Sequence, residues 1–421
     1  MILFSTARYR TIRWWIVGLL FAATVINYID RQALSILSTT LRSELGLTDS
    51  DYANVVSAFL FSYLIMYTVS GRLIDRFGVR MGVSVCVAWW SVAAMLTALA
   101  RGAFSLSVFR LLLGIGEPGI FPAGVKACGE WFPKHRRALA TGIFSSGGAV
   151  GAIIAAPLVA WITLHLGWRA AFLVSGIAGL LWLPLWLAVY RHPTRHPAVT
   201  PDELAQLDAG SVSMARSNWR DVLGRRHVWG LVLSRLASDP VWYFYLFWLP
   251  DYFQRMRHLS LAEIGLYGWI PFLSADLGNI VGGAASDSLI RRGWPAQRAR
   301  FAVLVAVASL APLGAFVGFM DSIVAAVVFT CMITFLCQAW STNMATLSAD
   351  LTDRSETGTV LGMMGTAGSL GGLVFAQVLG YSIALFGYSS AFVMAAILHP
   401  LAAVTLFLFL RPRLRQASTT P

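Results

Sequence analysis

Four charged residues lie inside long apolar runs of this chain. Asp30 and Arg31 are adjacent in the run that begins near Trp14, and a later run holds Arg110 and, seven residues on, Glu117. A charge at the centre of a membrane helix costs roughly 2.5–3.5 kcal/mol, so such residues usually face a bundle interior or a water-filled cavity. Arginine stays charged and presents a planar fork that suits a carboxylate. We therefore expect these residues to take part in one functional site.

The spacing of the two later charges constrains how they act. Seven residues make nearly two helical turns, so Arg110 and Glu117 share one helix face but lie about 10 Å apart along its axis. Each therefore needs another partner. A buried ion network with a purely structural role is the alternative interpretation. Because Asp30 and Arg31 add a second acid and a second base, the pattern favours a site in which the acids carry protons and the arginines bind an anion.

The elements that must position these residues are membrane helices. The chain has 421 residues, of which 57% are hydrophobic and only 12% are charged, whereas soluble proteins carry about 25% charged residues. Apolar runs long enough to cross about 30 Å of hydrocarbon predict an all-α membrane protein with twelve transmembrane helices. The predicted spans are 13–37, 52–71, 79–100, 103–125, 137–161, 168–190, 228–253, 262–285, 299–319, 322–348, 357–381 and 386–410.

The basic residues predict the orientation of the helices. The net charge of +12 is scattered over short loops rather than gathered in a patch, which argues against nucleic-acid binding. Loops on the side of the N-terminus hold most of the Lys and Arg residues. The positive-inside rule therefore places both termini and the 191–227 linker in the cytoplasm. The opposite loops hold only Arg42, Arg101, Arg169, Arg255 and Arg257.

An internal repeat divides the chain into two halves. Gly142, Gly148 and Gly151 recur at constant spacing as Gly362, Gly368 and Gly371, and Gly167-Trp168 recurs as Gly387-Tyr388. The predicted units are a six-helix N-terminal half (1–190), a linker (191–227) and a six-helix C-terminal half (228–421). Parallel repeats with a site at their interface are an architecture of secondary transporters.

The loop between the second and third spans carries a recognisable motif. It reads GRLIDRFGVR from Gly71 to Arg80, with glycines that permit a tight turn and an Asp beside an Arg cluster. It resembles the signature loop of the major facilitator superfamily. The resemblance implies that fold, and it implies a conformational latch formed by Gly71, Asp75, Arg76, Gly78 and Arg80.

The charged helices resemble one branch of that superfamily, the anion:cation symporters. The resemblance lies in Asn27-Tyr28-Ile29-Asp30-Arg31 and in Arg110 followed by Gly116-Glu117-Pro118. It implies that Asp30 and Glu117 couple transport to protons. It also implies that Tyr28, Arg31, Tyr63 and Arg110 hold the carboxylate and hydroxyl groups of an organic anion. No counterpart is found for the asparagine that galactonate carriers use on the eleventh helix.

The C-terminal half resembles the bacterial hexuronate transporters. The resembling segments run from Arg235 to Pro250 and from Trp269 to Gly278. For the other wall of the site, Tyr243, Trp340 and Asn343 are candidates, because aromatic faces suit a sugar ring and Asn and Tyr can bond hydroxyls. The pair Arg235 and Asp239 fits a structural role as well as a substrate role.

We therefore expect a proton symporter that imports a sugar acid, a hexuronate or a hexonate, across the bacterial inner membrane by alternating access. A proton-coupled carrier of another carboxylate, such as an aromatic acid, is the alternative, and a non-transporting sensor of sugar acids is a further one. No histidine pairs with a nucleophile, and no cysteine spacing suits a metal. We accordingly expect no enzyme activity, no cofactor and no metal. The partners expected are the anion, protons and lipid, with the protein a monomer.

Overall fold

The computed structural model describes residues 2–132, 134–197, 199–201, 203–204, 222–352 and 357–416. Within these ranges the chain is helical and contains no strand. The prediction of an all-α protein is confirmed. Part of the predicted linker, residues 205–221, lies outside the described residues.

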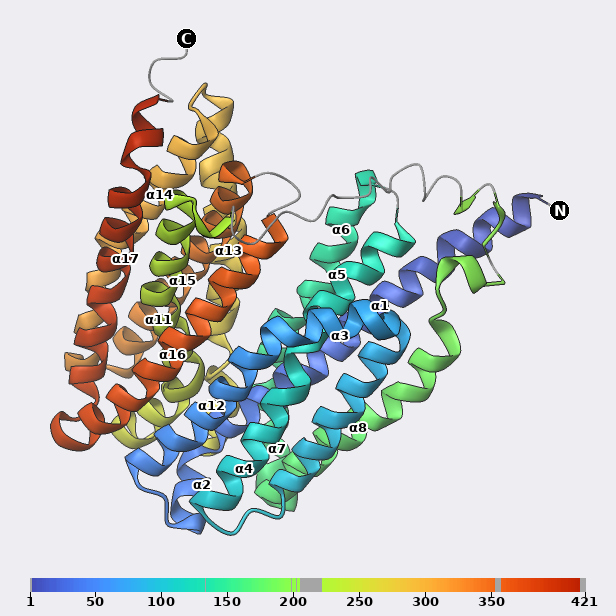
Figure 1. Ribbon diagram of the computed structural model, residues 1–421. Helices are drawn as coiled ribbons and strands as arrows, with labels where there is room; N and C mark the ends of the chain where they lie inside the picture. The colour runs from blue at the N-terminus through green and yellow to red at the C-terminus, as the bar shows by residue number, and fades with distance from the viewer. Residues whose placement is uncertain are drawn as a thin grey trace.

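The helices form two bundles that follow one another along the chain (Figure 1). The first bundle consists of α1 (Ile2–Ile36), α2 (Ser38–Leu45), α3 (Asp49–Thr97), α4 (Ala103–Gly116), η1 (Glu117–Gly119), α5 (Ile120–Trp131), α6 (Lys134–Ser145), α7 (Gly147–Leu166) and α8 (Trp168–Val189). The short turn η2 (Pro193–Arg195) follows it. The second bundle consists of α11 (Arg226–Arg257), α12 (Leu261–Tyr267), α13 (Ile270–Arg291), α14 (Ala296–Leu310), η3 (Ala311–Phe319), α15 (Ile323–Leu351), α16 (Thr357–Phe386) and α17 (Tyr388–Gln416).

The predicted spans correspond to these helices. In the part of the chain that the structure describes, nine helical stretches are long and apolar enough to cross a membrane. The other three predicted spans, 52–71, 228–253 and 262–285, are also largely helical, within α3, α11 and the α12–α13 pair.

Helix α3 covers two predicted spans, and its backbone leaves the helical conformation between them, inside the loop motif. Gly78 has φ 80° and ψ 161°, a conformation that glycine adopts at little cost. At its start, the Thr48 hydroxyl accepts a hydrogen bond from the Asp51 N–H at 3.1 Å, and the Asp51 carboxylate accepts from the Thr48 N–H at 3.0 Å. The Thr48 side chain and backbone together hold the pKa of Asp51 below its usual value.

The repeated glycines mark the same kind of contact in each bundle. A Cβ at Gly148 of α7 would lie 2.8 Å from the Tyr28 ring of α1. In the second bundle, a Cβ at Gly368 of α16 would collide with the Asp239 carboxylate of α11. Glycine is needed at both positions because the helices approach closely there. The short connections that follow α7 and α16 also correspond, since Gly167 and Gly387 both have positive φ.

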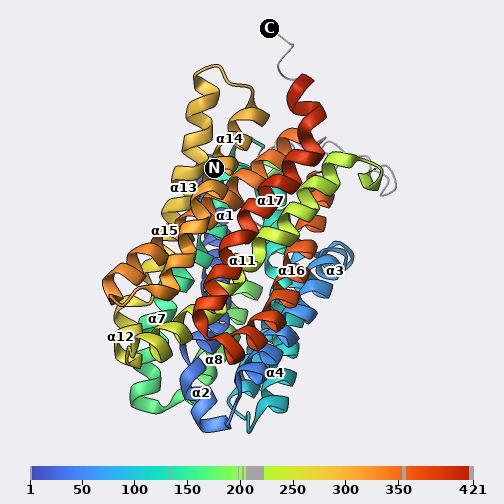
Figure 2. The same cartoon turned by 90° about the vertical axis from the view of Figure 1, so that its left-hand side faces the viewer.

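The bundles meet at one end of the molecule and diverge toward the other (Figures 1 and 2). They meet at the end that carries α2, where α3 packs on α16 and α7 packs on α12 and α13. The beginning of α1 and the end of α17 lie at the end where the bundles diverge. A site between the bundles is therefore closed off at the α2 end by helix packing.

Candidate functional site

A cavity of about 320 Å³ lies between the two bundles. Its walls combine charged, aromatic and hydroxyl-bearing side chains from both halves. The first bundle contributes, among others, Tyr28, Arg31, Tyr63, Tyr67 and Glu117, and the second contributes Arg235, Asp239, Tyr243, Gln338, Trp340, Ser341 and His399.

An ion pair between Arg31 and Glu117 dominates the wall of the first bundle. Arg31 Nη2 and Nε donate to Glu117 Oε2 at 2.6 and 3.0 Å. The side chain of Arg31 is 9% exposed and that of Glu117 is fully buried. Arg31 Nη2 also reaches the Asn27 amide oxygen, at 3.4 Å. The Oε1 atom of Glu117 has no hydrogen-bond partner among the described residues, so the carboxylate keeps one oxygen for a proton or a ligand.

Aromatic rings fix the guanidinium of Arg31. The guanidinium carbon lies 4.8 Å from the centre of the Tyr28 ring, 4.9 Å from that of Tyr63 and 5.5 Å from that of Phe59. Cation–π contacts of this kind are worth about 2 kcal/mol or more where water is excluded. They hold the fork in position beside the cavity.

The end of α4 brings Glu117 to the cavity. Helix α4 stops at Gly116, and a 3₁₀ turn with Pro118 at its start continues the chain into α5. A Cβ at Gly116 would lie 2.9 Å from the backbone nitrogen of Trp90. The small residue therefore lets α4 approach α3 closely while the turn presents Glu117 to α1.

Asp30 and Arg110 lie beside this pair, and neither lines the cavity. Both are buried, with 1% and 2% of their surface exposed. Arg110 Nη1 donates to the backbone oxygen of Asp30 at 3.4 Å, and its guanidinium lies 5.2 Å from the ring of Phe172. Asp30 interacts electrostatically with both Glu117 and Arg110. The four predicted charges thus form one buried cluster, in which Arg31 and Glu117 alone face the cavity.

A second ion pair lies on the wall of the C-terminal bundle. Arg235 Nη2 and Asp239 Oδ2 of α11 are 3.0 Å apart, and Arg235 Nη1 donates to the Ser341 hydroxyl of α15 at 3.0 Å. The side chains are 20% and 15% exposed. Tyr243, one turn further along α11, has its hydroxyl 3.3 Å from that of Ser369.

Of the two remaining candidates on this wall, Trp340 and Asn343, one lines the cavity and the other does not. Trp340 lines the cavity, with its ring 5.2 Å from and perpendicular to that of His399. Asn343 does not line it. Its amide donates to the backbone oxygens of Gly282 and Ala339 at 2.9 Å each, which ties α15 to α13.

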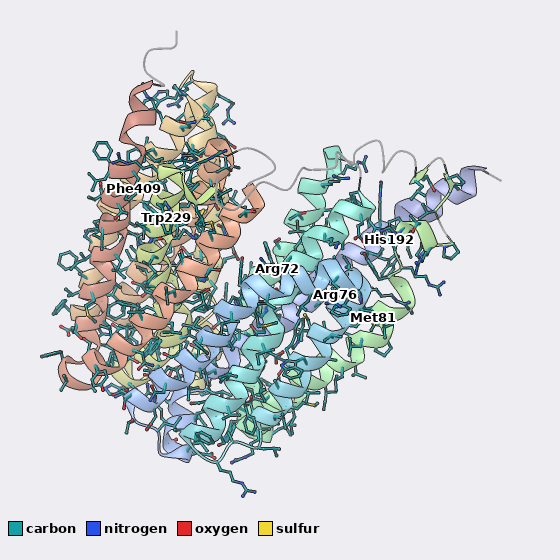
Figure 3. All side chains as sticks on the ribbon, viewed as in Figure 1. Arg72, Arg76, Met81, His192, Trp229 and Phe409 are labelled. Atoms are coloured by element: carbon teal, nitrogen blue, oxygen red, sulfur yellow. The ribbon has the colours of Figure 1, made fainter. Side chains whose placement is uncertain are left out.

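The latch motif lies on the end of the first bundle that faces the termini (Figure 3). Arg80 Nη2 donates to the Leu187 oxygen of α8 at 2.6 Å. Arg76 is exposed and its guanidinium lies 5.6 Å from the Phe77 ring. Gly71 is half-buried. The side chain of Asp75 lies outside the described residues.

A network of charges joins the halves at the opposite end. Arg42 lies 2.8 Å from Asp49 in its own half and 3.3 Å from Asp251 in the other. Arg255 lies 2.5 Å from Asp49 across the interface and 3.5 Å from Asp251 in its own half. Asp251 is fully buried and also accepts a hydrogen bond from the Tyr388 hydroxyl. Each half therefore contributes one base and one acid.

Sequence reasoning did not identify this network, nor Tyr67, Gln338, Ser341 and His399 in the cavity. The network residues lie at span edges, where a charge attracts no special notice. His399 carried a usable signal, since it is a lone histidine in the apolar run of α17.

Comparisons with known proteins agree with the fold. The family model of the Major Facilitator Superfamily matches residues 20–376. The hexuronate transporter of Escherichia coli K12 is 31% identical over 421 residues, 97% of each chain. The galacturonate transporter of Dickeya chrysanthemi is 34% identical over 280 residues, covering 65% of this chain and 81% of that one.

The fold comparison gives the same architecture. The crystal structure of a bacterial homologue of the human lysosomal transporter Spinster, inward-facing and unoccupied, superposes with a TM-score of 0.78 at 19% identity, covering 96% of this chain and 98% of that one. The chain therefore belongs to the major facilitator superfamily and is a membrane transporter, not an enzyme.

Proposed function

We propose that this protein imports a sugar acid, a hexuronate or a hexonate, by proton symport and alternating access. The observation that carries the proposal is the Arg31–Glu117 pair, 2.6 Å apart on the wall of a cavity between the two halves. The relatives named as hexuronate and galacturonate transporters support the choice of substrate class.

The pair explains how a proton and an anion can bind together. While Glu117 is ionised it neutralises Arg31. A proton on the Glu117 carboxylate breaks the ion pair, and the Arg31 fork is then free to hold the substrate carboxylate. When the anion leaves, Glu117 loses its proton and pairs with Arg31 again. The carboxylates of Glu117 and of the substrate thus exchange places at one guanidinium, and the proton stays on Glu117 while the anion is bound.

Charge balance in the buried cluster supports the same coupling. With Asp30, Glu117, Arg31 and Arg110 all ionised, the cluster is neutral. A bound monocarboxylate adds one negative charge, and one proton restores neutrality. Asp30 is the second candidate for that proton, because it interacts electrostatically with Glu117 and Arg110. Arg110 acts on the substrate indirectly, through this cluster.

We place the protein in the bacterial inner membrane with both termini in the cytoplasm. The closed end that carries α2 then faces outward, and the end with the termini faces inward. Transport requires the Arg42–Asp49–Asp251–Arg255 network to separate and the cytoplasmic ends to come together, where the residues of the latch motif meet the other half. Each elementary charge that crosses 100 mV is worth roughly 2.3 kcal/mol, so extra protons would harness the membrane potential.

Uptake into proteoliposomes tests the coupling. Glu117→Gln keeps the shape of the side chain but cannot exchange a proton, so it should abolish uphill accumulation. Asp30→Asn should also do so if Asp30 carries the proton. At least one of the two variants should still exchange labelled substrate across the membrane. If both variants accumulate substrate against a gradient as well as the parent does, the coupling assignment is wrong.

A carrier of aromatic carboxylates is the second candidate, because Trp242, Tyr243 and Trp340 line the cavity. A thermal-shift screen of the purified protein separates the two. Glucuronate, galacturonate, galactonate or gluconate should raise the midpoint of unfolding. A shift with phthalate alone would favour the aromatic-acid carrier.

A further inference from the structure

We propose that Arg235, Asp239, Ser341 and His399 form a subsite for sugar hydroxyls on the C-terminal wall of the cavity. The inference rests on the proposed function: the carboxylate of the sugar acid is bound at Arg31, and its hydroxyl-bearing end faces the other half. The subsite would then decide which sugar acid is accepted.

The two ion pairs border one cavity from opposite halves. Arg31 and Glu117 line it from the first bundle, and Arg235 and Asp239 line it from the second. Tyr67 lines the same cavity and interacts electrostatically with both Arg31 and Arg235. A cavity of about 320 Å³ lies at the small end of the range for ligand pockets. One small ligand in this cavity can therefore contact residues of both walls.

The C-terminal wall offers both donors and acceptors of hydrogen bonds. Nε of Arg235, Nδ1 of His399 and Nε1 of Trp340 are buried and have no hydrogen-bond partner among the described residues. The Asp239 carboxylate is the acceptor, and it is 15% exposed. Polar groups buried without partners are costly, so the wall is suited to a ligand that satisfies them.

The mixture of donors and an acceptor selects the chemical class. A hydroxyl group both donates and accepts, so neighbouring hydroxyls can donate to Asp239 while accepting from Arg235, and His399 can do either according to its tautomer. A second carboxylate only accepts. It would also meet the negative charge of Asp239, which already neutralises Arg235 at 3.0 Å. The wall therefore fits the hydroxyl end of a monocarboxylic sugar acid better than the far end of a dicarboxylic one.

Packing holds the subsite in place. Asp239 lies against Gly368 of α16, where a Cβ would collide with its carboxylate, and its Oδ1 accepts from Ser238 at 3.4 Å. Ser341 of α15 holds the other side of Arg235, at 3.0 Å. Residues from three helices thus fix the directions of the hydrogen bonds. A fixed set of directions can distinguish sugar acids that differ at a single hydroxyl.

Calorimetric binding to the purified protein in lipid nanodiscs tests the subsite. The probes are two pairs of epimers, galacturonate with glucuronate and galactonate with gluconate, together with the dicarboxylate galactarate. Asp239→Asn and Ser341→Ala should change the ratio of Kd values within an epimer pair by about tenfold or more, because they remove hydrogen bonds to hydroxyls. Asp239→Asn should also strengthen galactarate binding.

Matched variants make the outcome specific. Arg31→Lys should weaken both epimers by the same factor, because both carry the same carboxylate. Arg226→Gln, at an exposed position of the same helix α11, should change nothing. An epimer ratio unchanged in Asp239→Asn would overturn the subsite while leaving the proposed function intact. The subsite would also be overturned if Arg235→Gln lost binding of galactarate but kept binding of the monocarboxylates, because Arg235 would then bind a second carboxylate. If the parent protein binds none of the probes, the subsite and the proposed function fall together.

Discussion

Arg31 is positioned before any substrate arrives. One carboxylate and three aromatic rings surround its guanidinium, with Glu117 at 2.6 Å and the Tyr28 ring at 4.8 Å. Such an arrangement loses little freedom when the carboxylate of a ligand replaces that of Glu117. We therefore expect the shape of the side chain to matter as much as its charge.

Arg31→Lys tests this expectation. Lysine keeps the positive charge but loses the planar fork and its stacking on the rings. We expect the affinity for the sugar acid to fall by about tenfold or more, measured by titration calorimetry, since a charge-assisted hydrogen bond contributes about 1.5–3 kcal/mol. Arg226→Lys, outside the cavity, serves as the control. Equal affinities of Arg31→Lys and the parent would show that the site recognises charge alone.

The sequence could identify the charged cluster but not which members face the cavity. Asp30 and Arg31 are adjacent, and neighbouring residues on a helix point about 100° apart. Arg31 lines the cavity, whereas Asp30 is buried and does not line it. Only the rotation of α1 within the bundle decides between them, and that rotation depends on packing with distant helices. The same holds for Arg235 and Asp239, whose spacing alone did not distinguish a local pair from a wall of the site.

At the scale of helices, close approach at glycine positions sets the walls of the cavity. Gly148 and Gly151 of α7 contact Tyr28, each with a Cβ position 2.8 Å from an atom of that side chain. Tyr28 in turn packs on Arg31. The position of α7 therefore affects the position of Arg31 through Tyr28.

Gly148→Ala should weaken both folding and binding. The added methyl group would meet the Tyr28 ring at 2.8 Å, and overpacking of this kind costs about 1–3 kcal/mol. Thermal unfolding in detergent should show a lower midpoint, and calorimetry a weaker affinity for the sugar acid. Gly142→Ala is the control, because nothing lies within 4 Å of its Cβ position. If both variants behave alike, α7 does not position Tyr28.

Helix positions were predictable to the extent that they depend on local sequence. Runs of apolar residues predicted the spans, and the glycine in GRLIDRFGVR predicted the turn at Gly78. Contacts between distant segments were not predictable in this way. Arg42 and Asp251 are in different halves, and nothing in their local sequence shows that they lie 3.3 Å apart.

At the scale of the whole molecule, the network at the closed end can exchange partners. Arg42 contacts Asp49 within its half and Asp251 across the interface, and Arg255 contacts both acids likewise. When the halves separate, each base can keep the acid of its own half. Opening therefore leaves no buried charge without a partner, which would otherwise cost about 3–5 kcal/mol.

Asp251→Asn removes the acid with which Arg255 can pair inside the C-terminal half. Arg255 would then rely on Asp49 across the interface or stand alone, and Arg42 would lose one of its two acids. We expect opening at this end to cost more, because Arg255 would lose its last acid when the halves separate, and the population to shift away from the outward-open state. Electron–electron distance measurements between spin labels on the two halves at this end should show fewer long distances. The exposed Asp321, replaced by Asn, provides the control, and an unchanged distance distribution in Asp251→Asn would contradict this role.

The paired arrangement also has a consequence for how transport responds to salt. Screening by dissolved ions weakens exposed charge pairs and acts over about 8–10 Å at physiological ionic strength. Here two of the four contacts, those within each half, remain after opening, and three of the four side chains are 15% exposed or less in the closed state, so added salt screens the network weakly. The rate of uptake should therefore vary little between dilute and concentrated media, a useful property for a protein that faces an environment whose salinity the cell does not control. A steep dependence of uptake rate on potassium chloride concentration would show instead that the bonds across the interface dominate.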